Sequence, residues 1–266
     1  MSKEFQAYHL DGTAIDRDCR ACREKLPLPI AITMAFQPIF DFREGRVFAY
    51  EALVRGKDGQ SAGMVLDSIE SGMLYRFDQE CRMEAIKLAG RLFPADDDTK
   101  LSINFLPNAV YEPTACIRAS LAVARRARFA PSRLMFEFTE NEQMLDVPHV
   151  QKILHAYRAL GFTTAIDDFG AGFSSLQLLA DLQTDLLKLD MSLIRGIDGS
   201  RPRQAIVGRI CQLAGDLGMR CIAEGVETPQ ELATLRGLGI DLLQGYHLAR
   251  PEVEALPPVT LTSAVA

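Results

Sequence analysis

Short apolar runs alternate with longer helical patterns along this 266-residue chain, and this alternation is the feature that most constrains its fold. Most of the runs are rich in Val, Ile, Leu and Phe without strict polar alternation, which is typical of strands covered by helices. We interpret eight runs as strands, at residues 35–40, 47–53, 100–105, 134–138, 163–168, 186–190, 220–223 and 242–248. Helical spacing is found at residues 77–92, 150–160, 204–217 and 229–238.

Strands that alternate with helices in one mid-sized chain predict an α/β fold of the TIM (β/α)8 barrel type, with a doubly wound open sheet as the alternative. Pro38 lies inside the first run and indicates that this strand is irregular or unusually paired, because proline cannot donate a ladder hydrogen bond. Thr228 and Pro229 predict the start of a helix, and Gly161 and Gly218 predict helix ends.

The two ends of the chain differ in composition from the segment between them. We expect a short leader at residues 1–30, the barrel at residues 31–255 and a tail at residues 256–266. The polar leader contains Cys19 and Cys22 in a CxxC pattern, which is consistent with half of a metal site, a redox pair or a relic. The alternative is a capped turn that leads into the domain. No second cysteine or histidine pair follows at the spacing of a zinc finger.

Charge and hydropathy exclude several partners. The net charge is −6 and no basic run exists, so we expect no broad face for duplex nucleic acid. No apolar run approaches the roughly 18 residues that a membrane span requires. The first residues lack the apolar core of a signal peptide, so the sequence predicts a cytoplasmic protein without a membrane contact.

Two adjacent carboxylates, Asp167 and Asp168, end the fifth predicted strand and precede a glycine-rich loop. Ionising both is costly without a cation, which makes the pair a candidate metal bridge. Polar residues also lie near the ends of other predicted strands, where the strands of a barrel meet on one face. They are Glu51, Asn104, Glu137, Lys188, Glu224, Glu227 and Gln244.

Most of these residues are acidic, and Lys188 alone cannot balance them in a structural ion-pair network. Oxygen ligands without thiols suit Mg²⁺ or Mn²⁺ better than zinc. Such a cluster could hold two hard cations bridged by Asp167, which would polarise a phosphate and activate water. Lys188 would orient that water or neutralise phosphate charge. The four histidines stand apart, which disfavours a histidine-based nucleophile triad.

The same residues carry a family resemblance. The segment Glu51-Ala52-Leu53-Val54-Arg55 resembles the signature of EAL-domain cyclic-di-GMP phosphodiesterases. Further motifs of that family follow in its order between about residues 35 and 251. They are residues 36–39 (FQPI), Asn104, 136–140 (FEFTE), 167–170 (DDFG), 188–190 (KLD), 223–228 (AEGVET), 244–246 (QGY) and 250–251 (RP).

The resemblance implies a modified TIM barrel with one irregular, antiparallel strand. It implies hydrolysis of cyclic-di-GMP to linear pGpG, with two Mg²⁺ or Mn²⁺ ions per site, in a homodimer that serves bacterial second-messenger signalling. The alternatives are a catalytically silent cyclic-di-GMP receptor that acts through an unidentified protein partner, and a protein-interaction module that uses the leader.

The resemblance also implies roles for individual residues. The implied metal ligands are Glu51, Asn104, Glu137, Asp167, Asp168, Glu224 and Glu227. The implied catalytic residues are Glu51, Lys188, Glu224 and Glu140, of which Lys188 holds the attacking water and Glu140 anchors the loop after Asp168. The implied substrate contacts are Gln37, Leu53, Arg55 and Gln244, with Arg55 on a phosphate.

The sequence departs from the common family pattern in two segments. The segment between Arg55 and Phe77 is compact and lacks the usual tryptophan, as in a shorter subtype. No GGDEF-type, photoreceptor or receiver domain precedes the barrel, so we expect a short, stand-alone member. The loop after Asp168 contains Ala171 and Phe173 where threonine and tyrosine are commoner. Both loop glycines remain, so we expect modest effects on rate or regulation.

Overall fold

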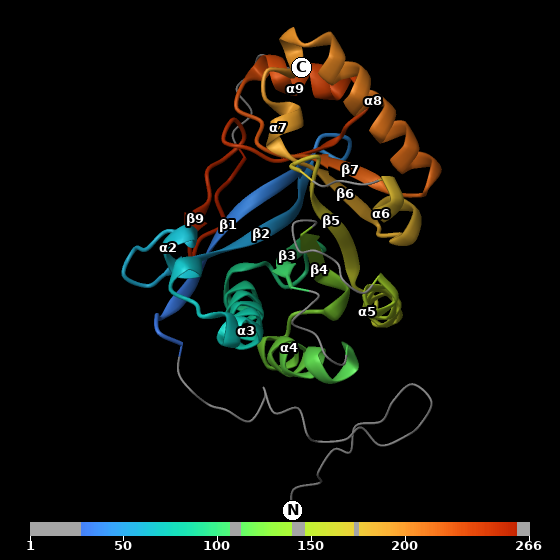
Figure 1. Cartoon of the computed structure of the whole chain (residues 1–266). Coiled ribbons are helices and arrows are strands. Elements are labelled where there is room, and N and C mark those ends of the chain that lie inside the picture. The colour runs from blue at the N-terminus through green and yellow to red at the C-terminus, as the bar shows by residue number, and fades with distance from the viewer. Residues whose placement is uncertain (1–27, 107–112, 140–146, 173–175, 260–266) are drawn as a thin grey trace, which may run out of the picture.

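The computed structural model describes residues 28–106, 113–139, 147–172 and 176–259 (Figure 1). The predicted leader with Cys19 and Cys22, the implied catalytic residue Glu140 and the loop residue Phe173 lie outside the described residues. The predicted domain boundaries therefore stay predictions.

Eight of the described strands close into a barrel in the order β2-β3-β4-β5-β6-β7-β8-β1, and β1 also pairs with β2. Neighbours from β2 to β8 run parallel, whereas β1 is antiparallel to both β2 and β8. The predicted barrel with one antiparallel strand is thus confirmed, and the open sheet is excluded. The strands are β1 (Ile32–Asp41), β2 (Arg46–Gly56), β3 (Lys100–Phe105), β4 (Leu134–Thr139), β5 (Thr163–Phe169), β6 (Leu186–Leu189), β7 (Arg220–Ala223) and β8 (Leu242–Leu243).

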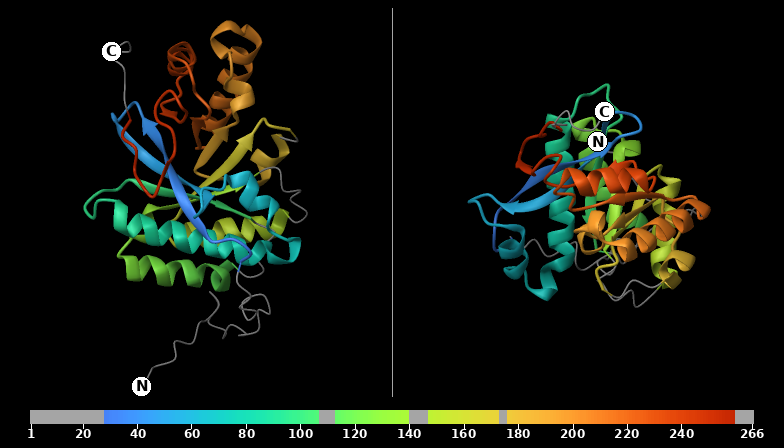
Figure 2. Two further views of the ribbon diagram at one scale, coloured as in Figure 1. Left: turned by 90° about the vertical axis from the view of Figure 1, so that its left-hand side faces the viewer. Right: turned by 90° about the horizontal axis from the view of Figure 1, so that it is seen from above.

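Helices pack around the outside of the strands (Figures 1 and 2). Each of the four predicted helices is found within a few residues of its expected bounds, whereas no helical span was predicted for α2, α4, α6 or α7. No described helix is long and apolar enough to cross a membrane. The helices are α2 (Ala62–Asp67), α3 (Leu74–Leu92), α4 (Pro113–Ala127), α5 (Val147–Ala159), α6 (Leu176–Asp181), α7 (Met191–Ile194), α8 (Arg201–Asp216) and α9 (Pro229–Gly237).

The predicted helix boundaries are confirmed by their cap geometry. At the start of α9, the Thr228 side chain accepts a hydrogen bond from the Glu231 backbone N–H, and the Glu231 carboxylate accepts one from the Thr228 N–H, each at 3.1 Å. This reciprocal pair satisfies two donors that the first helical turn leaves open. Gly161 and Gly218 follow α5 and α8 with φ of 80° and 78°, a conformation that favours glycine.

The last predicted strand, at residues 242–248, is wrong beyond Leu243. The Gly245 backbone passes so close to Val226 that a Cβ on Gly245 would lie 2.1 Å from the Val226 carbonyl oxygen. The Val226 N–H donates to the Gln244 carbonyl oxygen at 3.0 Å, so this segment bonds the loop after β7 instead of continuing a strand. A short strand that was not predicted, β9 (Glu252–Val253), pairs with β1.

The interior of the barrel has an apolar layer beneath a polar one. The apolar layer is one buried cluster of Ile39, Ala49, Met135, Ala165, Leu186, Ile222 and Leu242. Because strand side chains alternate between faces, the residues two positions later along the parallel strands, and two positions earlier along the antiparallel β1, also point inward. Those positions hold Gln37, Glu51, Glu137, Asp167, Lys188, Glu224 and Gln244. The apolar layer therefore closes the barrel below a polar layer at the C-terminal ends of the parallel strands.

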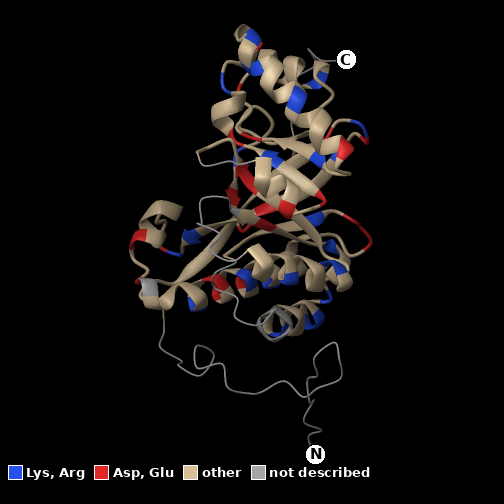
Figure 3. Ribbon diagram, turned by 45° about the vertical axis from the view of Figure 1, so that its right-hand side comes forward, with Lys and Arg blue, Asp and Glu red and all other residues tan. Residues whose placement is uncertain are grey.

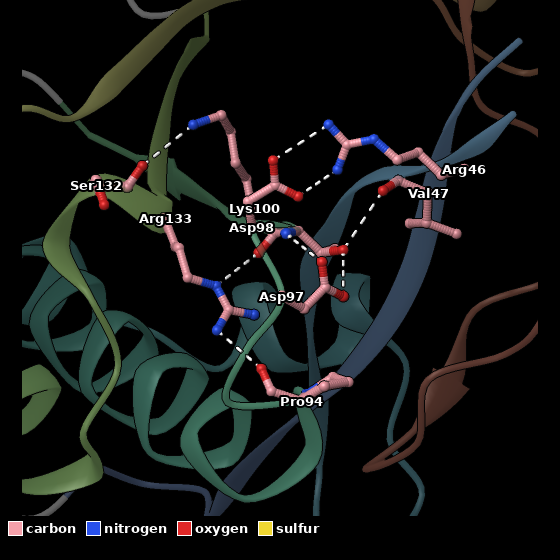
Figure 4. A network of polar contacts seen from close by, with 9 residues as sticks. Arg46, Val47, Pro94, Asp97, Asp98, Lys100, Ser132 and Arg133 are labelled. Atoms are coloured by element: carbon pink, nitrogen blue, oxygen red, sulfur yellow. Dashed lines mark hydrogen bonds and ion pairs between the residues drawn. The ribbon is translucent and has the colours of Figure 1, made fainter. Parts of the chain in front are cut away.

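A separate polar network ties together the opposite end of the barrel, where β2, β3 and β4 begin (Figure 4). Arg133 is buried there and donates to the carbonyl oxygens of Thr99 and Pro94, each at 3.0 Å. Its guanidinium also lies over the rings of Phe93 and Phe129. In barrels of this type the end opposite the active-site loops serves stability, and this packed, hydrogen-bonded network fits that role.

Candidate active site

Lys188 lies at the centre of a carboxylate cluster at the C-terminal ends of the strands, where Figure 3 shows acidic residues gathered. Its Nζ is 2.7 Å from Glu137 Oε2, 2.9 Å from Asp167 Oδ1, 2.5 Å from Glu224 Oε1 and 3.6 Å from Glu51 Oε2. The side chains of Lys188 and Glu137 are 1% and 0% exposed. One nearly buried ammonium thus faces four carboxylates, of which Glu224 is the most exposed at 17%.

Amide side chains hold one edge of this cluster. Asn104 Nδ2 donates to Glu51 Oε1 at 3.0 Å, and Gln244 Nε2 donates to Glu51 Oε2 at 2.7 Å. Gln244 Nε2 also lies 3.3 Å from Gln37 Oε1, and Gln37 Nε2 donates to the carbonyl oxygen of Ala249 at 3.2 Å. Glu51 is therefore oriented by residues from β3 and from the segment after β8.

Burial shifts the pKa values of the cluster. Burial raises the pKa of Glu137 to about 8, although Lys188 opposes this shift. Burial also raises the pKa of Asp167 and of Glu224. The pKa of Asp168 rises to about 6, through burial and then the neighbouring Asp167 charge. Burial alone would lower the pKa of Lys188, but the surrounding carboxylates raise it well above its ordinary value.

The metal-free protein should therefore lose stability as the pH rises from 5 to 8. Between the ordinary pKa of 4.5 and the folded value of about 8, folded Glu137 binds a proton that the unfolded chain releases. Stability linked to such a raised pKa is present at low pH and is lost as the pH passes the folded value. Thermal unfolding in EDTA across this range tests the prediction, and saturating Mg²⁺ or Mn²⁺ should flatten the slope. A metal-free melting temperature that climbs toward pH 8 would contradict it.

A bulge in β5 brings Asp167 and Asp168 to the same site. Ile166 pairs with Leu187 and Phe169 with Leu189, so β5 contains one more residue than β6 between these pairs. Asp168 has φ of 57°, in the left-handed region that is strained for a residue with a Cβ. In a regular strand, adjacent side chains would face opposite ways. The bulge and the strained backbone thus allow two neighbouring carboxylates to reach one cavity.

The cluster opens into a cavity of about 290 Å³ at this end of the barrel. Among the residues predicted for the site, its walls contain Gln37, Glu51, Asp167, Asp168, Lys188, Glu224, Glu227 and Gln244. Its other wall residues were not assigned a site role from the sequence, although each lies in or beside a quoted motif. They are Asp190, Met191, Gly225, Gly245 and Tyr246.

Of the predicted site residues that the structure describes, four lie outside the walls of this cavity. Asn104 and Glu137 still belong to the cluster through their bonds to Glu51 and Lys188. Leu53 and Arg55 follow Glu51 along β2, and Leu53 lines a second, apolar cavity of about 290 Å³ beside α2 and α3. Arg55 Nη1 donates to the Val54 carbonyl oxygen at 2.7 Å.

Two supporting residues were missed by the sequence interpretation. Ser102 is buried and donates to Glu137 Oε1 at 2.6 Å, which its inward position in β3 could have indicated. Glu231 is 1% exposed and accepts backbone N–H bonds from Gly196 and Glu227, both at 2.9 Å. Glu231 therefore ties the loop that carries the metal-ligand candidates to the segment after α7. Glu227 itself pairs with Arg195 at 2.8 Å.

The donor set fits a hard divalent cation. Asp167, Asp168 and Glu224 each offer one carboxylate oxygen, and these three atoms lie within 4.8 Å of one another. The buried Oδ1 of Asp167 has only the Lys188 ammonium beside it, at 2.9 Å, and the buried Oε1 of Gln244 accepts no hydrogen bond from the described residues. Clustered carboxylate oxygens that outnumber the available donors are suited to coordinate Mg²⁺ or Mn²⁺.

Comparison with known proteins gives one consistent family. The family model described as EAL domain matches residues 28–251. The structure is similar to that of a standalone versatile EAL protein from Vibrio cholerae O395 in its c-di-GMP bound form. The TM-score is 0.84 and the identity 48%, over 88% of this chain and 98% of that one. A manganese and cyclic-diGMP complex of Klebsiella pneumoniae BlrP1 matches with a TM-score of 0.80 and 36% identity, over 89% of this chain and 59% of that one.

One relative of known sequence is named for an enzymatic activity. The chain is 32% identical over 235 residues to the cyclic di-GMP phosphodiesterase NbdA of Pseudomonas aeruginosa, which is 83% of this chain and 29% of that protein. The chain spans about half or less of the length of the first curated relatives that it matches.

Proposed function

Because this chain belongs to the EAL domain family, we propose that it is a metal-dependent phosphodiesterase that hydrolyses cyclic-di-GMP to linear pGpG. The observation that carries the proposal is the cluster of buried carboxylates around Lys188 at the mouth of the barrel. A structural cluster would balance its charges, whereas this one has an excess of acid that a cation would neutralise. The similarity to a c-di-GMP bound structure and to a named phosphodiesterase supports the substrate.

The cofactor is proposed to be a pair of Mg²⁺ or Mn²⁺ ions. When bound, such ions polarise a phosphodiester, lower the pKa of a water molecule and stabilise the leaving oxygen. One ion would be held by Glu51, Asn104, Glu137 and Asp167. The other would be held by Asp167 and Asp168, with Glu224 and Glu227 beside it.

Lys188 is proposed to position the attacking water and to neutralise phosphate charge. The surrounding carboxylates raise its pKa, so the side chain stays an ammonium and can donate hydrogen bonds but cannot accept a proton. Glu137 and Asp167 fix its Nζ from inside the barrel.

A carboxylate must then accept the proton that the water releases. Glu224 is the best placed, because its side chain is 17% exposed while it touches Lys188. Burial raises the pKa of Glu224, which makes its carboxylate a stronger base.

Four further residues are proposed to bind the substrate. Gln37, Leu53, Arg55 and Gln244 are proposed to contact the dinucleotide, with the Arg55 guanidinium on a phosphate oxygen. Glu140 is proposed to anchor the loop after Asp168. The protein is proposed to act in the cytoplasm as a homodimer, with a signalling partner of unknown identity.

Product formation tests the proposal directly. The purified protein should convert cyclic-di-GMP to pGpG in the presence of Mg²⁺ or Mn²⁺, followed by chromatography with mass detection. Excess EDTA should stop the reaction and added metal should restore it, because the acidic cluster supplies ligands but no substitute for the cation. Binding without turnover would favour the silent receptor, and the absence of binding would refute both functions.

A further inference from the structure

Glu227 lines the acidic cavity at the barrel mouth, but it stands apart from the other acidic side chains there. Asp167, Asp168 and Glu224 each place one carboxylate oxygen within 4.8 Å of the other two. Glu227 is also among the described residues, yet it does not belong to that group. Its Oε1 lies 2.8 Å from Nη2 of Arg195 instead, so a guanidinium is the direct partner of this carboxylate.

The ion pair is held in place by the buried carboxylate of Glu231. Oε1 of Glu231 lies 3.7 Å from Arg195 Nη1, and the Glu231 side chain is 1% exposed. The same carboxylate accepts hydrogen bonds from the backbone N–H groups of Gly196 and Glu227, both at 2.9 Å. Glu231 thus joins the backbone beside Arg195 to the backbone of Glu227, and both members of the pair start from fixed positions.

The helix that precedes Arg195, α7, is packed against both loops that carry ligand candidates. A Cβ on Gly170 would lie 2.4 Å from Leu193 Cδ1, and a Cβ on Gly225 would lie 2.5 Å from Met191 Cβ. Both glycines have positive φ, of 103° and 67°, so each also adopts a backbone conformation that favours glycine. Such close approach leaves α7 little room to shift, and the arginine therefore extends from a rigid base.

The guanidinium affects cation binding in two ways. A carboxylate paired with Arg195 is drawn away from a cation, because the two positive groups compete for the same oxygens. The positive charge of Arg195 also lies beside the cavity and opposes the entry of a cation. Both effects lower the affinity of the site for a divalent metal.

We propose that Arg195 is a positioning residue that keeps Glu227 out of direct contact with a bound cation. The inference rests on the proposed function, in which Glu227 stands beside the second ion. A hydrolytic metal site needs coordination positions that remain open to water and substrate. Arg195 preserves such a position by occupying the carboxylate that would otherwise fill it. It acts through Glu227 and takes no part in the chemical step.

Arg195→Gln should tighten the binding of Mn²⁺. The substitution releases Glu227 and removes a positive charge, so the Kd for Mn²⁺ alone should fall roughly three- to tenfold in isothermal titration. The number of Mn²⁺-bound water molecules, measured by water-proton relaxation, should fall as Glu227 takes a coordination position. The kcat should fall as well, because water is displaced. Arg195→Lys keeps the charge, so its Kd should stay closer to that of the wild type.

The double variant Arg195→Gln/Glu227→Gln shows whether the gain in affinity depends on Glu227. It removes both charges of the pair together, so it should bind Mn²⁺ within about twofold of the wild type. Arg46→Gln is the matched control, because Arg46 pairs with Asp98 at the opposite end of the barrel (Figure 4). The control should bind Mn²⁺ as the wild type does. Melting temperatures in EDTA check that every variant is folded.

Unchanged or weaker Mn²⁺ binding by Arg195→Gln would overturn the role of Arg195, while pGpG formation by the wild type would leave the proposed function standing. Tighter binding that persists in the double variant would also overturn it, because the effect would then not pass through Glu227. A wild-type protein that binds Mn²⁺ but forms no pGpG would refute the proposed function instead, and the series of Kd values would still decide the role of Arg195.

Discussion

Lys188→Met should reduce hydrolysis by at least about 100-fold and destabilise the metal-free protein, because this ammonium serves both the reaction and the fold. Three carboxylates lie within 2.9 Å of its Nζ, and the variant leaves them buried without a counter-ion. Removing one partner of a buried ion pair costs several kcal/mol, which corresponds to a fall in melting temperature on the order of 10 °C. Initial rates and calorimetry in EDTA measure the two effects.

Lys100→Met is the matched control for this substitution. Lys100 Nζ donates to the Ser132 carbonyl oxygen at 3.1 Å, at the opposite end of the barrel (Figure 4). The control should keep a rate close to that of the wild type. Mn²⁺ should restore part of the stability that Lys188→Met loses, since a cation can take over the charge balance. An unchanged rate in Lys188→Met would refute the role of Lys188, and an unchanged metal-free melting temperature would refute its charge-balancing role.

Asp167→Asn should reduce activity about as much as Lys188→Met does, but it should raise the stability of the metal-free protein where Lys188→Met lowers it. The amide cannot bridge two cations as a carboxylate does, so hydrolysis should fall by roughly 100-fold or more. The substitution also removes one of four like charges around Lys188, so the metal-free protein should melt at a higher temperature than the wild type. Stabilisation by Mg²⁺ or Mn²⁺ should shrink, because it depends on the affinity of the folded state for the ion.

The matched control is Asp216→Asn, an exposed aspartate at the end of α8. It should leave the rate and the metal response of the wild type intact. An Asp167→Asn protein that Mn²⁺ stabilises as strongly as the wild type would show that Asp167 is not a metal ligand. Since Lys188→Met and Asp167→Asn should shift metal-free stability in opposite directions, general misfolding cannot produce both results.

Much of the fold followed from local pattern. The apolar runs predicted the barrel strands because a buried parallel strand needs side chains that are apolar on both faces. Pro38 correctly indicated an unusual strand, and β1 is the antiparallel one. Thr228 and Pro229 predicted a helix start because capping involves only neighbouring residues. The end of β8 was misjudged because it depends on the approach of Gly245 to Val226, which belongs to a different loop.

The acidic residues near the strand ends were recognisable from the sequence as a group, but their geometry was not. No pattern indicates that Lys188 touches Glu137, Asp167 and Glu224, because these contacts join strands far apart in the chain. The roles of Ser102 and Glu231 were missed for the same reason, since each acts through a partner on another element.

The sequence by itself determined which residue types stand near the strand ends, and therefore that the group contains many oxygen ligands and a single lysine. It could do so because the twofold alternation of a strand is a local property of the backbone. Only the tertiary structure decided which carboxylates meet, that a bulge brings Asp168 beside Asp167, and that Arg195 pairs with Glu227. Those outcomes depend on the register between distant strands and on close backbone approach, which arise only when the whole barrel closes.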